Sequence, residues 1–363
     1  MTRQQARNLA WVIAGFGFVG TALGWSTEPA VFPHAWLAAF AAWLGWPLGC
    51  LGLLLIHVLT GGQWGYALRP QLVAGLSTLR WLLIPVALPW LCVLPELYSW
   101  ARPGAATGLV NGFYLNRPFF FGRLLLYLVT WAGLCTWALR ALRTENPDPV
   151  LARLAPAGLI ILVLTITFSS IDLTLSLDPR FTSSVYGLIT IAEMGLFALA
   201  LAIFAAACAE PGASPELLSV LGKLLVGLVL LWAYLDFMQL LIDWESDLPT
   251  EATWYLIRRA GGWGATATFI TLGHFVLPWC ALIWPRVRRS RRGIAVVSGL
   301  LAFSAIVRSW WLVIPASGLP FSPVDVAAMA CVLGIGAALT LRGPRGGRPL
   351  PARILATGEQ HGG

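Results

Sequence analysis

Charged side chains are scarce in this sequence. Only 11% of its 363 residues are Asp, Glu, Lys or Arg, whereas about 25% is usual for a soluble protein. Apolar residues make up 58%, and the mean hydropathy is +0.76. Such a chain cannot cover a water-facing surface with polar groups, which excludes both a soluble enzyme and an intrinsically disordered protein. The composition predicts an integral membrane protein.

The sequence also lacks the residue patterns that hold metal cofactors. Its six cysteines are scattered through apolar segments, with no Cys-x-x-Cys pair and no metal-ligand spacing. A b-type haem needs two facing axial histidines, and only His57 and His274 lie in apolar segments, at different predicted depths. We therefore expect this chain to bind no haem, iron–sulfur cluster or other metal directly.

Long apolar runs, separated by Pro, Gly and charged residues, divide the chain into about ten segments. A bilayer core requires roughly 20 apolar residues for each helical span. The predicted spans are residues 9–25, 34–61, 73–93, 117–139, 156–177, 184–208, 219–241, 263–285, 293–315 and 323–341. No gap between them is long enough for a soluble domain. The sequence therefore predicts one all-α, polytopic transmembrane domain, which ends in a tail at 342–363.

Basic residues are distributed unevenly between the two sides that ten spans define. Most of the 24 lysines and arginines fall in the N-terminal segment, the C-terminal tail and loops 62–72, 140–155, 209–218 and 286–292. The positive-inside rule therefore places both termini in the cytoplasm and loops 94–116 and 242–262 outside. This asymmetry explains the net charge of +8 without a nucleic-acid partner. The first apolar run has the basic flank of a signal peptide, but its length favours an uncleaved span.

Several ionisable side chains fall inside the predicted spans. Such residues are costly in a bilayer and mark functional candidates. The outer half of the membrane is predicted to hold Arg123, Asp172, Glu193, Asp236 and Arg308. His274 is placed near the midplane and Arg80 in the inner portion, while Asp178, Asp247 and Glu251 are placed at the outer mouth.

Hydroxyl side chains surround Asp172 along its predicted span, namely Thr165, Thr167, Ser169, Ser170, Thr174 and Ser176. Carboxylates approached by hydroxyls and water suit a proton path. In that hypothesis Asp172, Glu193, Asp236 and His274 relay protons, while Arg123, Arg308 and Arg80 balance charge. Two alternatives stay open: buried ion pairs that hold the helices together, such as Arg123 or Arg308 with Asp172 or Asp236, and a ligand or quinol site.

Gly15, Gly17 and Gly20 match the Gly-x-Gly-x-x-Gly fingerprint of dinucleotide-binding folds. That motif functions between a strand and a helix, whereas here it lies inside an apolar span. Small residues in a membrane helix favour close helix packing instead. We therefore interpret these glycines as a packing surface.

Four ordered segments together resemble one family of membrane proteins. They are FYLNRPFFFGRLLLYLVTW (113–131), FSSIDLTLSLDPRFTSSVYGLI (168–189), GKLL…WAYLDFMQLLIDWESDLPTEATWYLIRR (222–259) and RSWWLVIPA (308–316), the last with the upstream GHFVLPW around His274. In order and spacing they are similar to the polysulfide-reductase-like membrane subunits of alternative complex III. The resemblance is closest to the F subunit, also called quinone-binding subunit 2 of quinol:cytochrome c oxidoreductase. Leu173 and Thr174 stand where that family has Trp and Met, so the chain resembles a divergent member.

The resemblance implies a function and partners. It implies a multi-pass subunit of a quinol-oxidising respiratory complex in a bacterial inner membrane, not catalytic alone, which provides a proton path and part of a quinone pocket. The implied partners are other membrane subunits, periplasmic haem and iron–sulfur subunits, quinone and the lipid bilayer. The F subunit itself carries no metal. The alternatives are a stand-alone secondary transporter, although no internal repeat is visible, and a purely structural membrane anchor.

The predicted outer loops are rich in aromatic residues, namely Trp100, Tyr114, Trp244, Trp254 and Tyr255. They suit a docking surface for periplasmic redox partners. They suit equally well an ordinary belt of aromatic side chains at the membrane interface.

Overall fold

The computed structural model describes residues 2–103, 111–209, 213–246 and 249–342, and within these ranges it contains helices and no strand. Nine helical segments in the described part of the chain are long and apolar enough to cross a membrane. Eight of them contain α1 (Arg3–Thr27), α2 (Phe32–Thr60), α5 (Arg117–Ala141), α6 (Pro147–Leu173), α7 (Tyr186–Cys208), α8 (Pro215–Ser246), α13 (Arg291–Val313) and α14 (Pro323–Arg342). The ninth, Trp263–Ile283, is interrupted at its centre. The prediction of an all-α, multi-pass membrane protein is confirmed.

The predicted span 73–93 differs from the structure. Helix α3 runs from Gln63 to Ala87, so it begins ten residues earlier, and the chain then turns into the short helix α4 (Trp90–Leu97). Gly61 and Gly62 have positive φ values of 72° and 102°, which allow an abrupt turn from α2 directly into α3. Two arginines and two glutamines lower the hydropathy of α3. It is a long helix packed against α2, α5, α7 and α14, although it is less apolar than the other nine.

The predicted loops contain more helix than hydropathy alone indicates. Loop 94–116 includes the end of α4 and a short 3-10 turn (Ser99–Ala101), and loop 242–262 includes the end of α8 and a short helix α9 (Pro249–Ile257). The other helices begin and end within a few residues of their predicted spans, except that α1 and α6 begin six and nine residues earlier and α8 extends four and five residues further at its two ends. The predicted tail beyond Arg342 lies outside the described residues.

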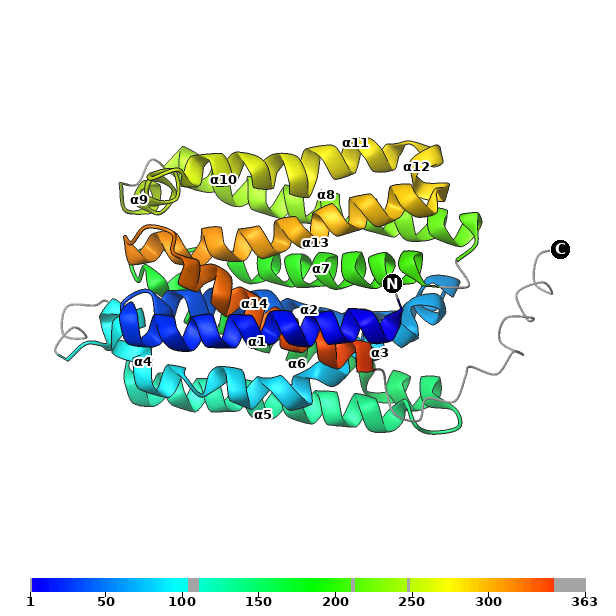
Figure 1. Ribbon diagram of the computed structural model, residues 1–363, viewed down its shortest axis with the longest axis horizontal. Coiled ribbons are helices and arrows are strands. Elements are labelled where there is room, and N and C mark those ends of the chain that lie inside the picture. The colour runs from blue at the N-terminus through cyan, green and yellow to red at the C-terminus, as the bar shows by residue number, and fades with distance from the viewer. Residues whose placement is uncertain (1, 104–110, 210–212, 247–248, 343–363) are drawn as a thin grey trace.

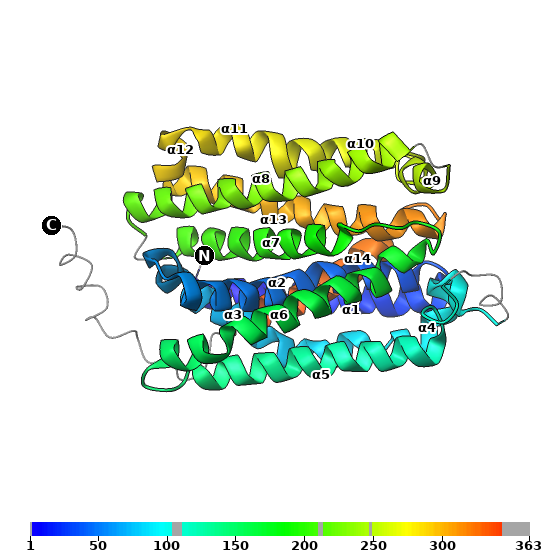
Figure 2. The ribbon, with the colours of Figure 1, turned by 180° about the vertical axis from the view of Figure 1, so that it is seen from behind.

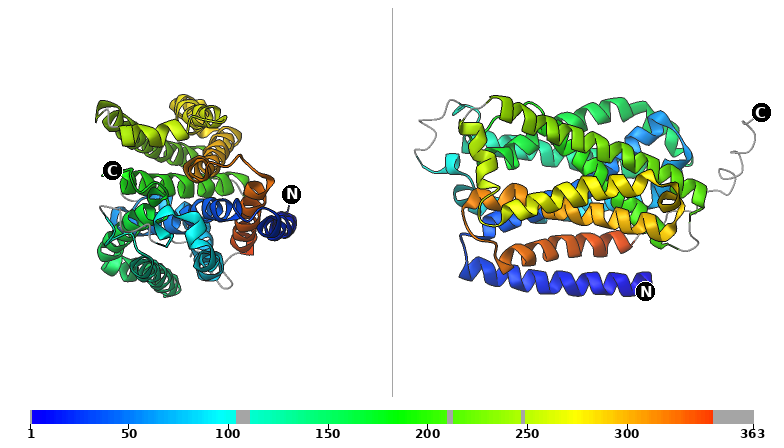
Figure 3. Two further views of the ribbon diagram at one scale, coloured as in Figure 1. Left: turned by 90° about the vertical axis from the view of Figure 1, so that its left-hand side faces the viewer. Right: turned by 90° about the horizontal axis from the view of Figure 1, so that it is seen from above.

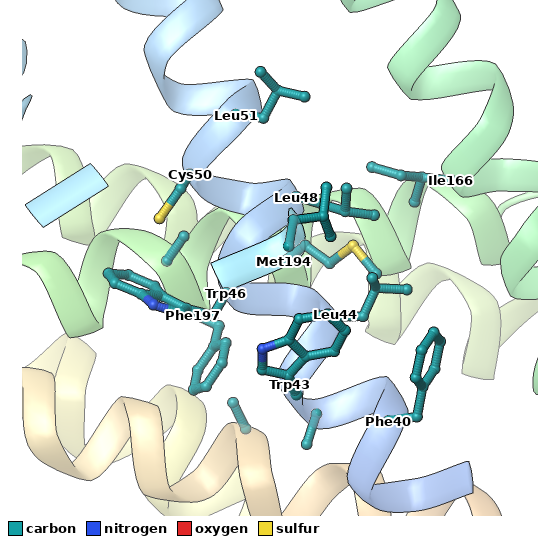
Figure 4. Close-up of a cluster of buried hydrophobic side chains, with 14 of the residues drawn as sticks. Phe40, Trp43, Leu44, Trp46, Leu48, Cys50, Leu51, Ile166, Met194 and Phe197 are labelled. Carbon is teal, nitrogen blue, oxygen red and sulfur yellow. The ribbon is translucent and has the colours of Figure 1, made fainter. Parts of the chain in front are cut away.

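Helix α2 is the centre of the bundle. It is apolar on all sides, which is the pattern of a helix surrounded by protein. Helices α3, α6, α7, α13 and α14 pack around it (Figure 3). Figure 4 shows its side chains Phe40, Trp43 and Leu48 among Met194 and Phe197 from α7. Viewed from behind, α5 lies along one edge of the bundle and α10 (Trp263–Ile270) and α11 (Leu277–Ile283) along the other (Figure 2).

Helix α1 is peripheral and packs chiefly on α14 (Figure 3). A β-carbon at Gly17 would lie within 2.8 Å of the Ala327 carbonyl oxygen, and one at Gly24 within 2.6 Å of Val324. A β-carbon at Gly15 would meet no atom within 4 Å. The absence of side chains at Gly17 and Gly24 therefore lets the two backbones approach closely, as the packing interpretation of this glycine-rich run predicts.

The two ends of the described chain lie at the same end of the bundle (Figure 1). The Arg3 Nε atom donates a hydrogen bond of 3.1 Å to the Leu341 carbonyl oxygen, which joins α1 to α14 there. The arginine-rich helix α12 (Pro285–Arg289) lies at this end, whereas α4 and α9 lie at the opposite end (Figure 1). We call these ends inner and outer, following the arginine distribution; which end faces the cytoplasm stays a prediction.

Candidate functional site

Four of the predicted polar residues come together within the outer half of the bundle. Glu193 from α7, Asp236 from α8, Arg308 from α13 and His274 from the interrupted span form one cluster, which we call the Glu193 cluster. Neither α7 nor α13 has another charged residue between its ends, so Glu193 and Arg308 are single charges on largely hydrophobic helices. Their positions are fixed by packing of the surrounding apolar faces.

Glu193 is the least engaged carboxylate of the cluster. Its Oε2 atom lies 3.4 Å from His274 Nε2 and 4.0 Å from Arg308 Nε, and neither contact has hydrogen-bond geometry. Both carboxylate oxygens are buried and have no hydrogen-bond partner among the described residues. A buried carboxylate without a donor is costly unless it is protonated or hydrated. Glu193 is therefore suited to accept a proton or a water molecule.

Asp236 is the main counter-ion of Arg308. The Arg308 Nη2 atom donates a hydrogen bond of 2.7 Å to Asp236 Oδ1, much shorter than the 4.0 Å between Arg308 and Glu193. The Asp236 side chain is 40% exposed, whereas that of Arg308 is 6% exposed. The arginine is thus neutralised mainly from α8, which leaves Glu193 with an incomplete counter-charge.

His274 lies in a π-helical segment, Thr271–Val276, between α10 and α11. π-Helical turns are rare and frequently occur at functional sites. The ring of His274 is fully buried and meets the Trp232 ring edge-on, with centroids 4.4 Å apart. Its Nδ1 atom has no hydrogen-bond partner in the described part of the chain. The π-helical turn and the contact with Trp232 together orient the His274 ring so that its Nε2 atom faces Glu193.

Polar residues continue from the cluster along α8 toward the outer end. Gln239 Nε2 donates a hydrogen bond of 2.6 Å to Asp243 Oδ2, and Ser183 donates to Gln239 Oε1. Gln239 and Asp243 are buried and were not among the predicted site residues. The sequence does contain a pattern that indicates Gln239 and Asp243. Trp232, Asp236, Gln239 and Asp243 are spaced four, three and four residues apart, which places them on one face of a helix.

A small cavity of about 80 Å³ adjoins Glu193 and Arg308. It lies between α2, α6, α7 and α13, and most of its wall is apolar. The polar part of the wall is formed largely by hydroxyls, including Ser170, Thr174 and Tyr186, and the Tyr186 Oη atom donates a hydrogen bond of 2.8 Å to Thr174 Oγ1. Some of the hydroxyls predicted to surround Asp172 therefore face Glu193 instead.

Asp172 lies outside this cluster, in a separate ion pair. Arg123 donates to it through Nε and Nη2, with both hydrogen bonds 2.8 Å long, and Tyr127 Oη donates a third of 2.7 Å. Arg123 also stacks 3.7 Å from the ring centroid of Tyr114 and donates to its carbonyl oxygen. Burial raises the pKa of Tyr114 to about 12. Of the ion pairs that the sequence left open, Arg123 with Asp172 and Arg308 with Asp236 are the ones formed.

Two of the predicted outer-mouth residues, Asp178 and Glu251, make contacts with different partners. Asp178 forms a 3.5 Å ion pair with the largely exposed Arg180. Glu251 accepts hydrogen bonds from Ser246 (2.8 Å) and Thr182 (3.3 Å). Asp247 lies outside the described residues. Glu251 is thus connected, through Ser246, to the outer end of the polar face of α8.

Arg80 does not join either cluster. Its side chain is exposed, it lies 5.3 Å from the ring centroid of Trp81, and no carboxylate among the described residues forms an ion pair with it. Its predicted role in balancing the charge of the relay residues therefore has no contact to support it.

A third polar group, partly buried and not predicted from the sequence, lies at the inner end. Arg69 Nη2 is 2.6 Å from Asp148 Oδ1, and Tyr66 donates a hydrogen bond of 2.8 Å to Asp148 Oδ2. His57 Nε2 lies 3.0 Å from the carbonyl oxygen of Gly62. These contacts tie the turn between α2 and α3 to the start of α6. Nothing in the linear sequence marks this group, because its members come from separate predicted loops and a span end.

The outer-end aromatic residues are buried or half-buried, except Trp244. Trp100 and Trp254 are 2% and 5% exposed, whereas Trp244 is 74% exposed. Trp254 stacks on the buried Arg258, whose guanidinium lies 3.7 Å from the ring centroid. Burial lowers the pKa of Arg258 to about 10. Trp100 and Trp254 therefore fasten the outer turns to the bundle, and Trp244 is the residue of the set that is free to meet lipid or a partner.

No group of three or more His, Cys, Asp or Glu side chains within the described ranges is arranged to hold a metal ion. The chain matches no protein-family model and no curated protein. What it does in the membrane is therefore inferred from the Glu193 cluster and its surroundings.

Proposed function

We propose that this chain is a multi-pass subunit that provides a proton path across a bacterial inner membrane, within a quinol-oxidising respiratory complex. The observation that carries the proposal is the environment of Glu193. Its carboxylate is buried, has no hydrogen-bond partner among the described residues, and lies 3.4 Å from the Nε2 atom of His274. An acid and a base at this distance are within reach of proton transfer after a small adjustment.

Two features near Glu193 are proposed to bring protons to the cluster. One is the cavity beside it, whose volume of about 80 Å³ is sufficient for roughly five water molecules at about 15 Å³ each. The other is the α8 face, from Glu251 and Ser246 through Asp243 and Gln239 to Asp236. Water in the cavity relays a proton from the outer solution to the Glu193 carboxylate, and Glu193 passes it to the unprotonated Nε2 atom of His274, which becomes imidazolium. Asp236 assists by holding Arg308, which would otherwise keep Glu193 ionised.

Asp172 is assigned a structural role in this proposal. A carboxylate that accepts two hydrogen bonds from Arg123 and one from Tyr127 has little capacity left for a mobile proton. The relay therefore comprises Glu193, His274 and Asp236, with Arg308 as the balancing charge.

Membership in a respiratory complex rests on the four sequence segments that resemble alternative complex III. Each of the four contains one charged residue of the two buried polar sites, namely Arg123, Asp172, Asp236 and Arg308. In such a complex, partner subunits supply the haem and iron–sulfur centres, and this chain contributes part of a quinone pocket and the proton path.

Proton conduction is tested with the purified chain in proteoliposomes. A pH-sensitive dye inside the vesicles reports proton entry driven by a potassium diffusion potential. Wild type is expected to acidify the lumen faster than empty vesicles, and Glu193→Gln is expected to slow this at least tenfold, which is the scale of a general acid–base contribution. Glu245→Gln is the matched control, because Glu245 is exposed at the outer end of α8. Equal rates for Glu193→Gln and wild type, or a wild type no faster than empty vesicles, would contradict the proposal.

Complex membership has a separate test. The chain, tagged and purified in mild detergent from its native membrane, is expected to bring haem-bearing and iron–sulfur-bearing subunits with it. Recovery of the chain alone would contradict this part of the proposal and leave the proton path standing.

A secondary transporter is the second candidate. It is favoured by the π-helical interruption at His274, since transporters bind substrates at discontinuous helices near the membrane centre. Solute uptake by the same proteoliposomes, driven by a proton gradient and abolished in Glu193→Gln, would favour that function.

A further inference from the structure

An open hollow lies on the surface of the bundle where α5 ends, at the inner end. Its volume is about 600 Å³, within the range of about 300–1,000 Å³ that is common for ligand sites. Its wall consists of Gly133, Thr136, Trp137, Arg140 and Thr144, together with Ala132, Ala141 and Val150. In Figure 1 this is the end of α5 that leads into α6, on the same side as the N-terminus.

The hollow carries unpaired positive charge. Arg140 lines it and is exposed, and Arg143 and Arg153 are exposed nearby in the sequence. None of these three arginines forms an ion pair with a carboxylate in the described part of the chain. Glu145 is exposed in the same connection, and the remaining acid there, Asp148, is held by Arg69. The charges around the hollow therefore favour an anion.

The groups within the hollow suit a phosphate ester at a membrane interface. Arg140 offers several N–H donors in a planar group that matches phosphate oxygens. Thr136 has an exposed hydroxyl, while the Thr144 hydroxyl donates to the Ala141 carbonyl oxygen and keeps its own oxygen free to accept. Trp137 is half-buried, as is typical of aromatic side chains at the level of lipid headgroups.

Apolar surface continues from the hollow toward the middle of the membrane. Leu126 and Val129 on α5 are exposed, as are Leu154 and Ile161 on α6. A free phosphate ion would leave this surface unused, and a zwitterionic lipid would bring a second positive charge to Arg140. A molecule with an anionic head and two acyl chains matches both the charge and the apolar surface.

We propose that this hollow binds an anionic phospholipid, with its phosphate at Arg140 and its acyl chains along the outer faces of α5 and α6. Clusters of basic residues beside cytoplasmic helix ends recognise such lipids by this combination of charge and apolar contact. The site is independent of the Glu193 cluster, which lies on other helices.

Three variants separate this site from general lipid adhesion. Arg140→Gln removes the charge. Gly133→Leu places an apolar side chain in the hollow, and its β-carbon meets no atom within 4 Å. Gly122→Leu is the matched control, because Gly122 lies on the same helix with equally open space but outside the hollow.

The measurement is the apparent Tm of the purified full chain in detergent, with phosphatidylglycerol, phosphatidylcholine or inorganic phosphate added. A ligand of the folded state raises Tm as its concentration increases. Phosphatidylglycerol is expected to raise Tm of wild type and Gly122→Leu equally, and to lose at least half of that shift in Arg140→Gln and Gly133→Leu. The other two additives are expected to shift none of them. The same phosphatidylglycerol shift in all four proteins, or an equal shift from phosphatidylcholine or phosphate, would overturn the proposal.

Discussion

Arg123 holds the carboxylate of Asp172 through two hydrogen bonds of 2.8 Å each, which join α5 to α6. Their side chains are only 9% and 1% exposed. Glu193, by contrast, faces its nearest cation at 4.0 Å and has no hydrogen-bond partner among the described residues. The sequence places these two acids at similar depths in adjacent spans, but their hydrogen bonding in the structure differs. One accepts three hydrogen bonds from neighbouring side chains, and the other accepts none from the described residues.

We predict that Asp172→Asn destabilises the protein strongly. It would strand the Arg123 guanidinium in a buried site, and loss of one partner of a buried ion pair costs about 3–5 kcal/mol. The apparent Tm of the purified variant in detergent measures the effect. Asp178→Asn is the control, because its partner Arg180 is 67% exposed and such a pair contributes less than about 1 kcal/mol.

A double replacement distinguishes loss of a partner from loss of the site itself. Arg123→Met combined with Asp172→Leu leaves no unpaired charge, so it is expected to recover a large part of the stability lost in Asp172→Asn. A double variant that is less stable than Asp172→Asn would show that the stranded charge is not the cause.

Hydropathy and charge are sufficient to predict the long helices and the general depth of the buried charges. The length of an apolar run depends only on neighbouring residues in the sequence, so each long apolar helix can be predicted from the sequence. Helix ends are less visible where the chain turns without a polar loop, which is why α3 begins at Gln63, inside a predicted loop. Asp243 was missed because it falls in the predicted outer loop, although it is buried on α8.

The pairing of charges cannot be predicted from sequence alone. Which arginine meets which acid depends on which helices are neighbours and how each is rotated. α5 lies beside α6, so Arg123 meets Asp172, whereas α13 contacts both α7 and α8, so Arg308 lies between Glu193 and Asp236. The inner group of Tyr66, Arg69 and Asp148 depends on the same long-range packing.

We predict that the end of the bundle with α4 and α9 faces the periplasm. A cysteine at Ser246 is expected to react with an impermeant thiol reagent added to intact spheroplasts, and a cysteine at Arg292 is expected to react after lysis only. Both positions are exposed, at opposite ends of the bundle. The background protein has serine at the exposed native cysteines Cys92, Cys208 and Cys280. The reverse labelling pattern would invert the assignment of inner and outer ends.

We predict that Gly17→Ala weakens the attachment of α1 to the bundle. Its β-carbon would lie 2.8 Å from the Ala327 carbonyl oxygen and closer still to the Cys331 amide nitrogen, both of which are backbone atoms of α14 that cannot rotate away. α1 must then shift outward, and forced overpacking of this kind costs about 1–3 kcal/mol. Gly15→Ala is a matched control two residues away, where the new β-carbon meets nothing within 4 Å.

The control is expected to be neutral or to gain up to about 1 kcal/mol, because Ala is favoured over Gly inside a helix. The same substitution should therefore act in opposite directions at two positions of one helix. The measurement is the apparent Tm of each purified variant, with protease sensitivity of α1 as a second observable. Because α1 packs chiefly on α14, its release should raise cleavage of the N-terminal segment while the rest of the chain stays resistant. Equal Tm values and equal cleavage of the Gly17→Ala and Gly15→Ala variants would show that close backbone approach does not hold α1 in place.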